Sequence, residues 1–180
     1  MGQKHGVWFD LLDHLAIHTK VLSSYSWLVK SGDDKYTLKT INHGTHLEIS
    51  HEASFYTNNG FYVEIAKRTI SSSEKPPKYG MTKAFSYDCF DKNKKEKVLQ
   101  YHSPHSTSFN SNAPWHDKPH RHIFIGNQQF IEIYSFDHRP LNDRLKKYSW
   151  EKGSINLLFL GHEDWPFVSE FLEEVVDLNV

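Results

Sequence analysis

Five basic side chains lie within seven positions of one another in the segment NAPWHDKPHRHIFIG, residues 112–126. They are His116, Lys118, His120, Arg121 and His122. Imidazolium and guanidinium groups this close repel one another when charged, and a bound anion or metal ion would relieve that repulsion. The cluster therefore indicates either a binding site or a polar rim, and the surrounding elements decide between the two.

The apolar run Ile-Phe-Ile that closes the cluster predicts a strand over residues 120–125. Side chains alternate between the two faces of a strand. His120 and His122 should therefore share one face, and Arg121 should lie on the other.

A second pair of imidazoles ends another expected strand, in the segment VLQYHSPH, residues 98–105. If the two strands are neighbours, His102 and His105 converge with the first cluster at one end of a sheet. The competing interpretation is a polar strand at a sheet edge without any site, since polar side chains there resist edge-to-edge aggregation.

Acid–base cleavage of RNA without a metal is the first chemistry that these residues could support. One neutral imidazole takes the 2′-hydroxyl proton, and a second, protonated imidazole gives a proton to the leaving 5′ oxygen. His120 and His122 would form this pair, with His102 as a substitute. Cationic side chains would stabilise the negative charge of the transition state. The phosphate-contacting residues would be Arg121, Lys118 and His105. No cofactor is needed.

Zinc binding is the second chemistry. A His-x-His pair on a strand and one further imidazole form a donor set that suits Zn²⁺ and leaves coordination positions open. The best triad in the sequence is His116, His120 and His122, with His102 or His105 as replacements. In this interpretation the protein need not be an enzyme.

Length and composition favour one soluble domain in a reducing compartment. The chain has 180 residues, a formal net charge of −1 with histidine neutral, and a single cysteine, Cys89. The net charge gives no global reason to bind nucleic acid or a membrane surface, so any anion binding must be local. One cysteine excludes an internal disulfide, and no apolar run approaches the length of a membrane span. We expect a cytoplasmic protein without membrane contact.

Alternating apolar and polar residues predict a series of hairpins. The dipeptide Asn59-Gly60 is a favoured two-residue turn between two alternating segments. The hairpins are expected over residues 24–41, 53–70, 82–102 and 120–136. Segments rich in Ser, Asn and Pro, residues 71–80 and 103–119, are expected loops.

Helical spacing of apolar residues predicts an amphipathic helix near each end, over residues 7–23 and 164–179, with Asp164 as the N-cap of the second. The run 155–160 is expected to be a buried strand. The predicted fold class is therefore α+β: a single domain, residues 1–180, with an antiparallel β-sheet of hairpins flanked by an N-terminal and a C-terminal α-helix.

The order of these features resembles the toxins of TumE-like toxin–antitoxin modules. A strand turns at NNG into FYVEIAKRT, and AFSYDCFD returns through a charged turn as KEKVLQYHSPH. Then come HDKPHRHIF, a closing hairpin and the helical segment DWPFVSEFLEEVVDL. The elements YHSPH and KPHRH stand in for the two His-bearing elements of the family. The resemblance covers about residues 55–137 and 163–178.

The resemblance implies a toxin-like ribonuclease that acts on RNA and is paired with a helix-turn-helix antitoxin. It divides the domain into an N-terminal extension (about 1–50), a toxin-like sheet core (about 51–137), and a polar connection with the C-terminal helix (about 138–180). The family-like positions are His102, His105, His120, Arg121 and His122. The alternative function is a non-catalytic metal- or partner-binding accessory protein of a mobile-element or defence system.

Overall fold

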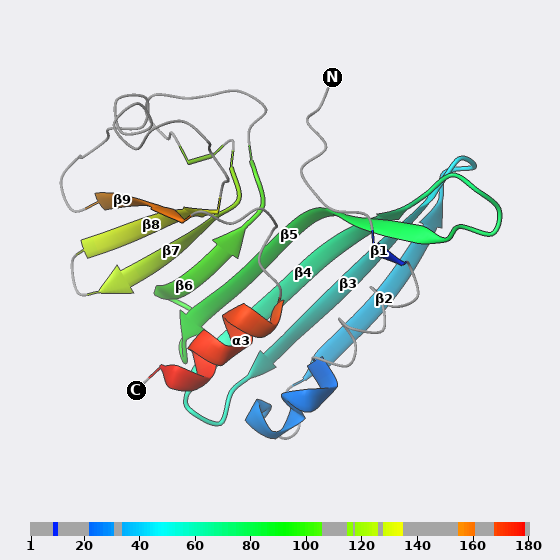
Figure 1. Cartoon of the computed structure of the whole chain (residues 1–180). Coiled ribbons are helices and arrows are strands. Elements are labelled where there is room, and N and C mark those ends of the chain that lie inside the picture. The colour runs from blue at the N-terminus through cyan, green and yellow to red at the C-terminus, as the bar shows by residue number, and fades with distance from the viewer. Residues whose placement is uncertain are drawn as a thin grey trace.

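A large twisted β-sheet carries one well-defined helix on one face in the computed structural model of the chain (Figure 1). The structure describes residues 9–10, 22–30, 34–105, 115–116, 118–125, 128–134, 155–160 and 168–178. Its strands are β1 (Phe9–Asp10), β2 (Lys35–Asn42), β3 (Leu47–Tyr56), β4 (Phe61–Ser71), β5 (Tyr79–Asp91), β6 (Lys97–His102), β7 (His120–Ile125), β8 (Gln128–Tyr134) and β9 (Ile155–Leu160). The helical elements are a 3₁₀ turn, η1 (Ser26–Leu28), and α3 (Val168–Asp177).

The sheet follows the chain order, β2-β3-β4-β5-β6-β7-β8-β9, with β1 paired to β5. Neighbours from β2 to β8 are antiparallel, whereas β9 runs parallel to β8. Local hairpins produce such a meander, because antiparallel neighbours need only short connections. The expected α+β class with an antiparallel sheet is confirmed.

Three of the four expected hairpins are present: β3–β4, β5–β6 and β7–β8. The first turns where Gly60 has a φ of 92°, a left-handed conformation that glycine adopts without steric cost. The connection from β4 to β5 spans residues 72–78, inside the expected loop 71–80. Most of the expected loop 103–119, and the turn at 126–127, lie outside the described residues.

The predicted hairpin over residues 24–41 is wrong. Residues 26–28 form η1 instead of a strand, and β2 pairs along its whole length with β3, from Lys35 opposite Ser54 to Asn42 opposite Leu47. The turn at Gly44, with a φ of 82°, brings β2 and β3 together. Only residues 43–46 separate β2 from β3, whereas the upstream segment curls into the 3₁₀ turn and offers β2 no extended partner over residues 26–28.

The predicted N-terminal helix over residues 7–23 is wrong at its start, because Phe9–Asp10 forms β1 and pairs with Gly80 and Tyr79. Residues 22–24 are helical, and residues 11–21 lie outside the described part of the chain. At the other end of the chain, α3 begins at Val168, so the expected N-cap Asp164 also lies outside the described residues. No helix among the described residues is long and apolar enough to cross a membrane.

The main core lies between α3 and one face of the sheet (Figure 1). The Phe171 ring packs against Tyr87 and Tyr101, with centroid distances of 5.7 and 5.6 Å. Asn59, in the β3–β4 turn, donates a 2.9 Å hydrogen bond to the carbonyl oxygen of Val175. Burying aromatic side chains of this size is strongly stabilising. The helix therefore covers one face of β4–β6 and leaves the polar residues that alternate with the core on the opposite face.

Candidate functional site

The imidazoles lie on the face of the sheet opposite α3, where β6 and β7 pair. His102 is directly opposite His120, and Gln100 is opposite His122. The ring centroids of His102 and His120 are 5.8 Å apart, and those of His120 and His122 are 4.9 Å apart. The expectation that the two His-bearing strands are neighbours, with their imidazoles converging, is confirmed.

Two further imidazoles come from the connection between these strands. The His105 ring lies 5.1 Å from that of His120 and 5.3 Å from that of His116. The backbone N–H of His105 donates a 2.7 Å hydrogen bond to the carbonyl oxygen of His116. Trp115 is buried beside them, its ring centroid 6.3 Å from that of His122. The two ends of the connection are thus held together over the strand imidazoles.

His102, His105 and His120 each offer a ligand nitrogen, and these atoms all lie within 4.8 Å of one another. Among the described residues, this is the one group of three metal-ligating side chains whose ligand atoms lie this close together. The favoured triad of the sequence, His116, His120 and His122, is therefore not the set that converges. The replacements His102 and His105 take the places of His116 and His122.

His120 has an unused lone pair inside the protein. Its side chain is fully buried, and Nδ1 donates a 2.7 Å hydrogen bond to the carbonyl oxygen of Lys118. A carbonyl only accepts, so Nδ1 carries the proton and Nε2 is the basic nitrogen of the neutral ring. Nε2 is buried and has no hydrogen-bond partner among the described residues. A buried polar atom without a partner costs free energy unless something binds it.

Asp88 of β5 orients His102. Its Oδ1 accepts hydrogen bonds from His102 Nε2 at 2.8 Å and from Gln100 Nε2 at 2.5 Å, while Oδ2 accepts one from the Ser86 hydroxyl at 2.6 Å. Burial alone would raise the pKa of Asp88, but the hydrogen bonds from His102 and Ser86 outweigh it and hold the pKa below its usual value. The ionised carboxylate fixes the proton of His102 on Nε2, and Nδ1 is left with the lone pair.

Three imidazoles of the cluster, those of His105, His120 and His122, are neutral at physiological pH. Desolvation within the cluster, reinforced by neighbouring imidazoles, lowers the pKa of the otherwise exposed His105 to about 4 and that of the buried His122 to about 3. The pKa of His120 falls to about 2, chiefly through burial. His122 Nδ1 lies 2.6 Å from the Gln129 amide nitrogen, and a neutral ring can accept that hydrogen bond. Neutral imidazoles are metal ligands and weak general acids.

Arg121 is not brought to the imidazoles. It points to the α3 side of the sheet, where its guanidinium pairs with Glu132 and Glu174 and donates a 2.9 Å hydrogen bond to the Tyr101 hydroxyl. Its guanidinium is therefore committed to linking α3 to the sheet, and its predicted role as a phosphate ligand lacks structural support. Lys118 contributes its carbonyl oxygen to His120.

Sequence reasoning missed Asp88, Gln100 and Gln129. In the segment AFSYDCF, Ser86 and Asp88 are the polar residues of an otherwise apolar strand, so they should share the face away from the core. That alternation was a usable signal. Their contact with His102 depends on the β5–β6 register, in which Ser86 lies opposite His102 and Asp88 opposite Gln100.

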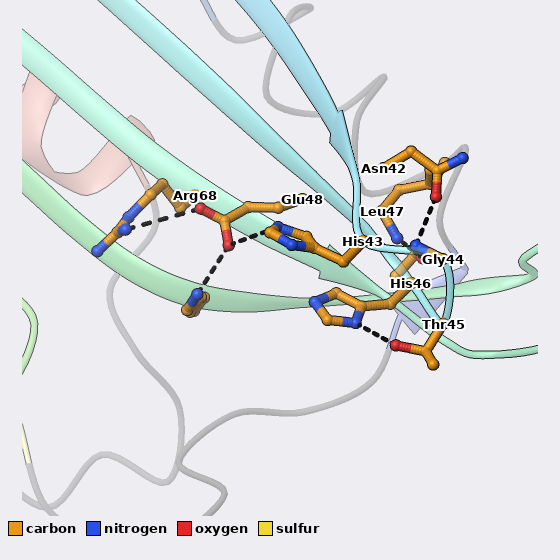
Figure 2. A network of polar contacts seen from close by, with 10 residues as sticks. Asn42, His43, Gly44, Thr45, His46, Leu47, Glu48 and Arg68 are labelled. Carbon is orange, nitrogen blue, oxygen red and sulfur yellow. Dashed lines mark hydrogen bonds and ion pairs between the residues drawn. The ribbon is translucent and has the colours of Figure 1, made fainter.

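A second polar cluster lies around Glu48, which is buried (Figure 2). Its carboxylate contacts Lys83 at 2.7 Å and both Arg68 and His43 at 3.7 Å. The hydrogen bond from Lys83 leads the effects that keep the pKa of Glu48 below its usual value. The His43 ring stacks on that of His46 with centroids 4.8 Å apart. This carboxylate is fully engaged with cations, and the cluster ties β3, β4 and β5 together.

Comparison with protein-family models, with curated proteins and with solved structures finds no match. The resemblance to TumE-like toxins therefore stays a prediction, and the site has to be interpreted from its own geometry.

Proposed function

We propose that this chain is a zinc-binding protein whose metal centre is formed by His102, His105 and His120. The observation that supports it best is the convergence of three imidazole nitrogens, one from each residue, within 4.8 Å. The Nε2 of His120 is buried and has no hydrogen-bond partner among the described residues, so it is available as a ligand atom. A zinc ion would satisfy that nitrogen. Three nitrogen ligands also leave a fourth position open for water or a bound molecule.

The charge state of the ligands favours a metal. A metal must displace any proton from its imidazole ligands, and the lowered pKa values of His105 and His120 remove that competition. Asp88 supplies the carboxylate that typically holds a zinc-bound histidine in place.

Binding requires the three nitrogens to close in. Zinc–nitrogen bonds of about 2.05 Å place tetrahedral ligand nitrogens about 3.4 Å apart, so a separation of 4.8 Å has to shorten by about 1.4 Å. His105 is exposed and lies beyond the end of β6, whereas His120 is fixed within β7. We expect His105 to make most of this movement.

Acid–base cleavage of RNA without a metal is less well supported. That chemistry needs one protonated imidazole near neutral pH, while the pKa values of His120 and His122 are about 2 and 3. The cation expected to stabilise the transition state, Arg121, is paired with carboxylates on the other face. Ribonuclease activity and the toxin role stay untested predictions.

Cobalt(II) provides an optical test of the proposal, because four-coordinate Co²⁺ absorbs visible light strongly and occupies zinc sites. Titration of the untagged, metal-free protein should produce this absorption and saturate at one equivalent. His105→Ala should abolish it, and because His105 is exposed, this variant should keep the fold. His46→Ala, in the β2–β3 turn, is the matched control and should titrate like the wild type. Absence of the absorption in the wild type, or its persistence in His105→Ala, would reject the proposed centre.

A further inference from the structure

A cavity of about 360 Å³ lies on the same face of the sheet as the imidazoles. A volume of this order suits a small molecule. The lining residues come from β2, β3, β4 and β5: Lys35, Thr37, Glu52, Ala53, Ser54, Glu64, Ile65, Ala66, Ser86 and Asp88.

The strand register makes this cavity adjoin the proposed metal centre. Ala66 lies opposite Ser86, and Ser86 lies opposite His102. In the next row, Glu64 lies opposite Asp88. Ser86 and Asp88 line the cavity, and Asp88 holds His102 by a 2.8 Å hydrogen bond. The cavity therefore ends at β5, one strand away from His102 on β6 and two strands away from His120 on β7.

The charge of the cavity is negative. Three carboxylates line it, Glu52, Glu64 and Asp88, against a single ammonium group, that of Lys35. Three negative charges and one positive charge leave a net of −2. Glu64 lies directly opposite Asp88, whereas Glu52 lies opposite the small side chain of Ala66, which leaves room beside it. Such a wall repels phosphate-rich ligands and attracts cations.

We infer that the cavity binds a small organic molecule through an ammonium or guanidinium group, held by Glu64 and Glu52, and directs the rest of the molecule toward the metal centre. The second half of this inference rests on the proposed function. A charge-assisted hydrogen bond to a carboxylate is stronger than a neutral one and gives the pocket its selectivity.

Two probes that differ by one amine test the inference: 6-aminohexanoate and hexanoate. Each carries a carboxylate that can bind zinc, and only the first carries an ammonium group. Calorimetry on the zinc-loaded protein should give at least tenfold tighter binding of 6-aminohexanoate. The double variant Glu52→Gln/Glu64→Gln should lose that preference and keep its zinc content. A matched control, Glu96→Gln in the β5–β6 turn, should keep both.

The outcomes separate this inference from the proposed function. Equal binding of the two probes by the zinc-loaded wild type, or an unchanged preference in the double variant, overturns the cation pocket and leaves the metal centre standing. Failure to bind zinc overturns the metal centre. If the protein binds no zinc but still prefers 6-aminohexanoate, the carboxylates of the cavity are supported as a cation site. If it binds no zinc and shows no preference, the cation site is overturned as well.

Discussion

Zinc should stabilise the wild-type protein against heat, and removal of one imidazole should abolish that effect. A ligand that binds only the folded state at one hundred times its dissociation constant adds about 2.7 kcal/mol. For a chain of this size that corresponds to a rise in melting temperature of roughly 5–10 °C. His120→Ala should show no zinc-induced rise, because His120 supplies the ligand nitrogen that lacks a hydrogen-bond partner within the protein.

The relevant readout is the zinc-induced shift and not the melting temperature alone. His120→Ala removes a fully buried side chain and leaves the Lys118 carbonyl oxygen without its hydrogen-bond donor. The free energy of unfolding of the metal-free variant should therefore fall by about 2–4 kcal/mol. His105→Ala avoids this complication, because its side chain is exposed. It should melt like the wild type without zinc and show no shift with it. A full shift in either variant, with His46→Ala as the unaffected control, would place the zinc elsewhere.

Acidification should destabilise the metal-free protein steeply below about pH 6.5, the ordinary pKa of histidine. Burial lowers the pKa of His51 to about 4, that of His120 to about 2 and that of His122 to about 3. Below pH 6.5 these three histidines bind protons in the unfolded chain but stay neutral in the folded chain. The stability contributed by these neutral rings is therefore complete above pH 6.5 and declines as the pH falls toward the folded pKa values.

Three such histidines give an unfolding transition that takes up about three protons near pH 5, a slope approaching about 4 kcal/mol per pH unit. Denaturant titrations at half-unit steps between pH 7 and pH 5 measure this slope. His122→Gln should reduce it by about one proton, and Thr45→Ser, which removes no ionisable group, should leave it unchanged. A stability independent of pH over this range would show that these rings bind protons as readily in the folded state as in the unfolded chain, and would contradict the lowered pKa values.

The convergence of the imidazoles could be predicted from the sequence because it depends on two local rules. Alternation placed His120 and His122 on one face, and the convergence with His102 followed on the condition that β6 and β7 pair across the long connection 103–119, which they do. Alternation also sent Arg121 to the opposite face. Its partners Glu132 and Glu174 are 11 and 53 positions further along the chain, and only the folded structure brings them to it.

The composition of the proposed metal centre could not be predicted, because it depends on where the two ends of the connection between β6 and β7 lie. Proximity in sequence favoured His116, but His105 is the residue whose nitrogen meets those of His102 and His120. Similarly, the contact of Asp88 with His102 follows from the β5–β6 register, which the turn at residues 91–96 fixes. Patterns along one strand do not encode the register between two strands.

The pairing of β2 and the direction of β9 illustrate the same limit. The alternating pattern of residues 35–41 predicts a strand, which is observed as β2. The pattern does not say whether this strand pairs with the segment before it or with β3, which is its observed partner. The run 155–160 was expected to be a strand, and its parallel pairing with β8 requires a long connection whose course the sequence pattern leaves open.

Zinc content is the measurement that tests the central claim most directly. The untagged protein, equilibrated with micromolar zinc and then freed of loosely bound metal by gel filtration, should carry one zinc per chain by mass spectrometry of the metal. His105→Ala and His120→Ala should carry less than a tenth of that amount, and His46→Ala should match the wild type. A wild type without zinc, or variants that retain it in full, would contradict a metal centre formed by His102, His105 and His120.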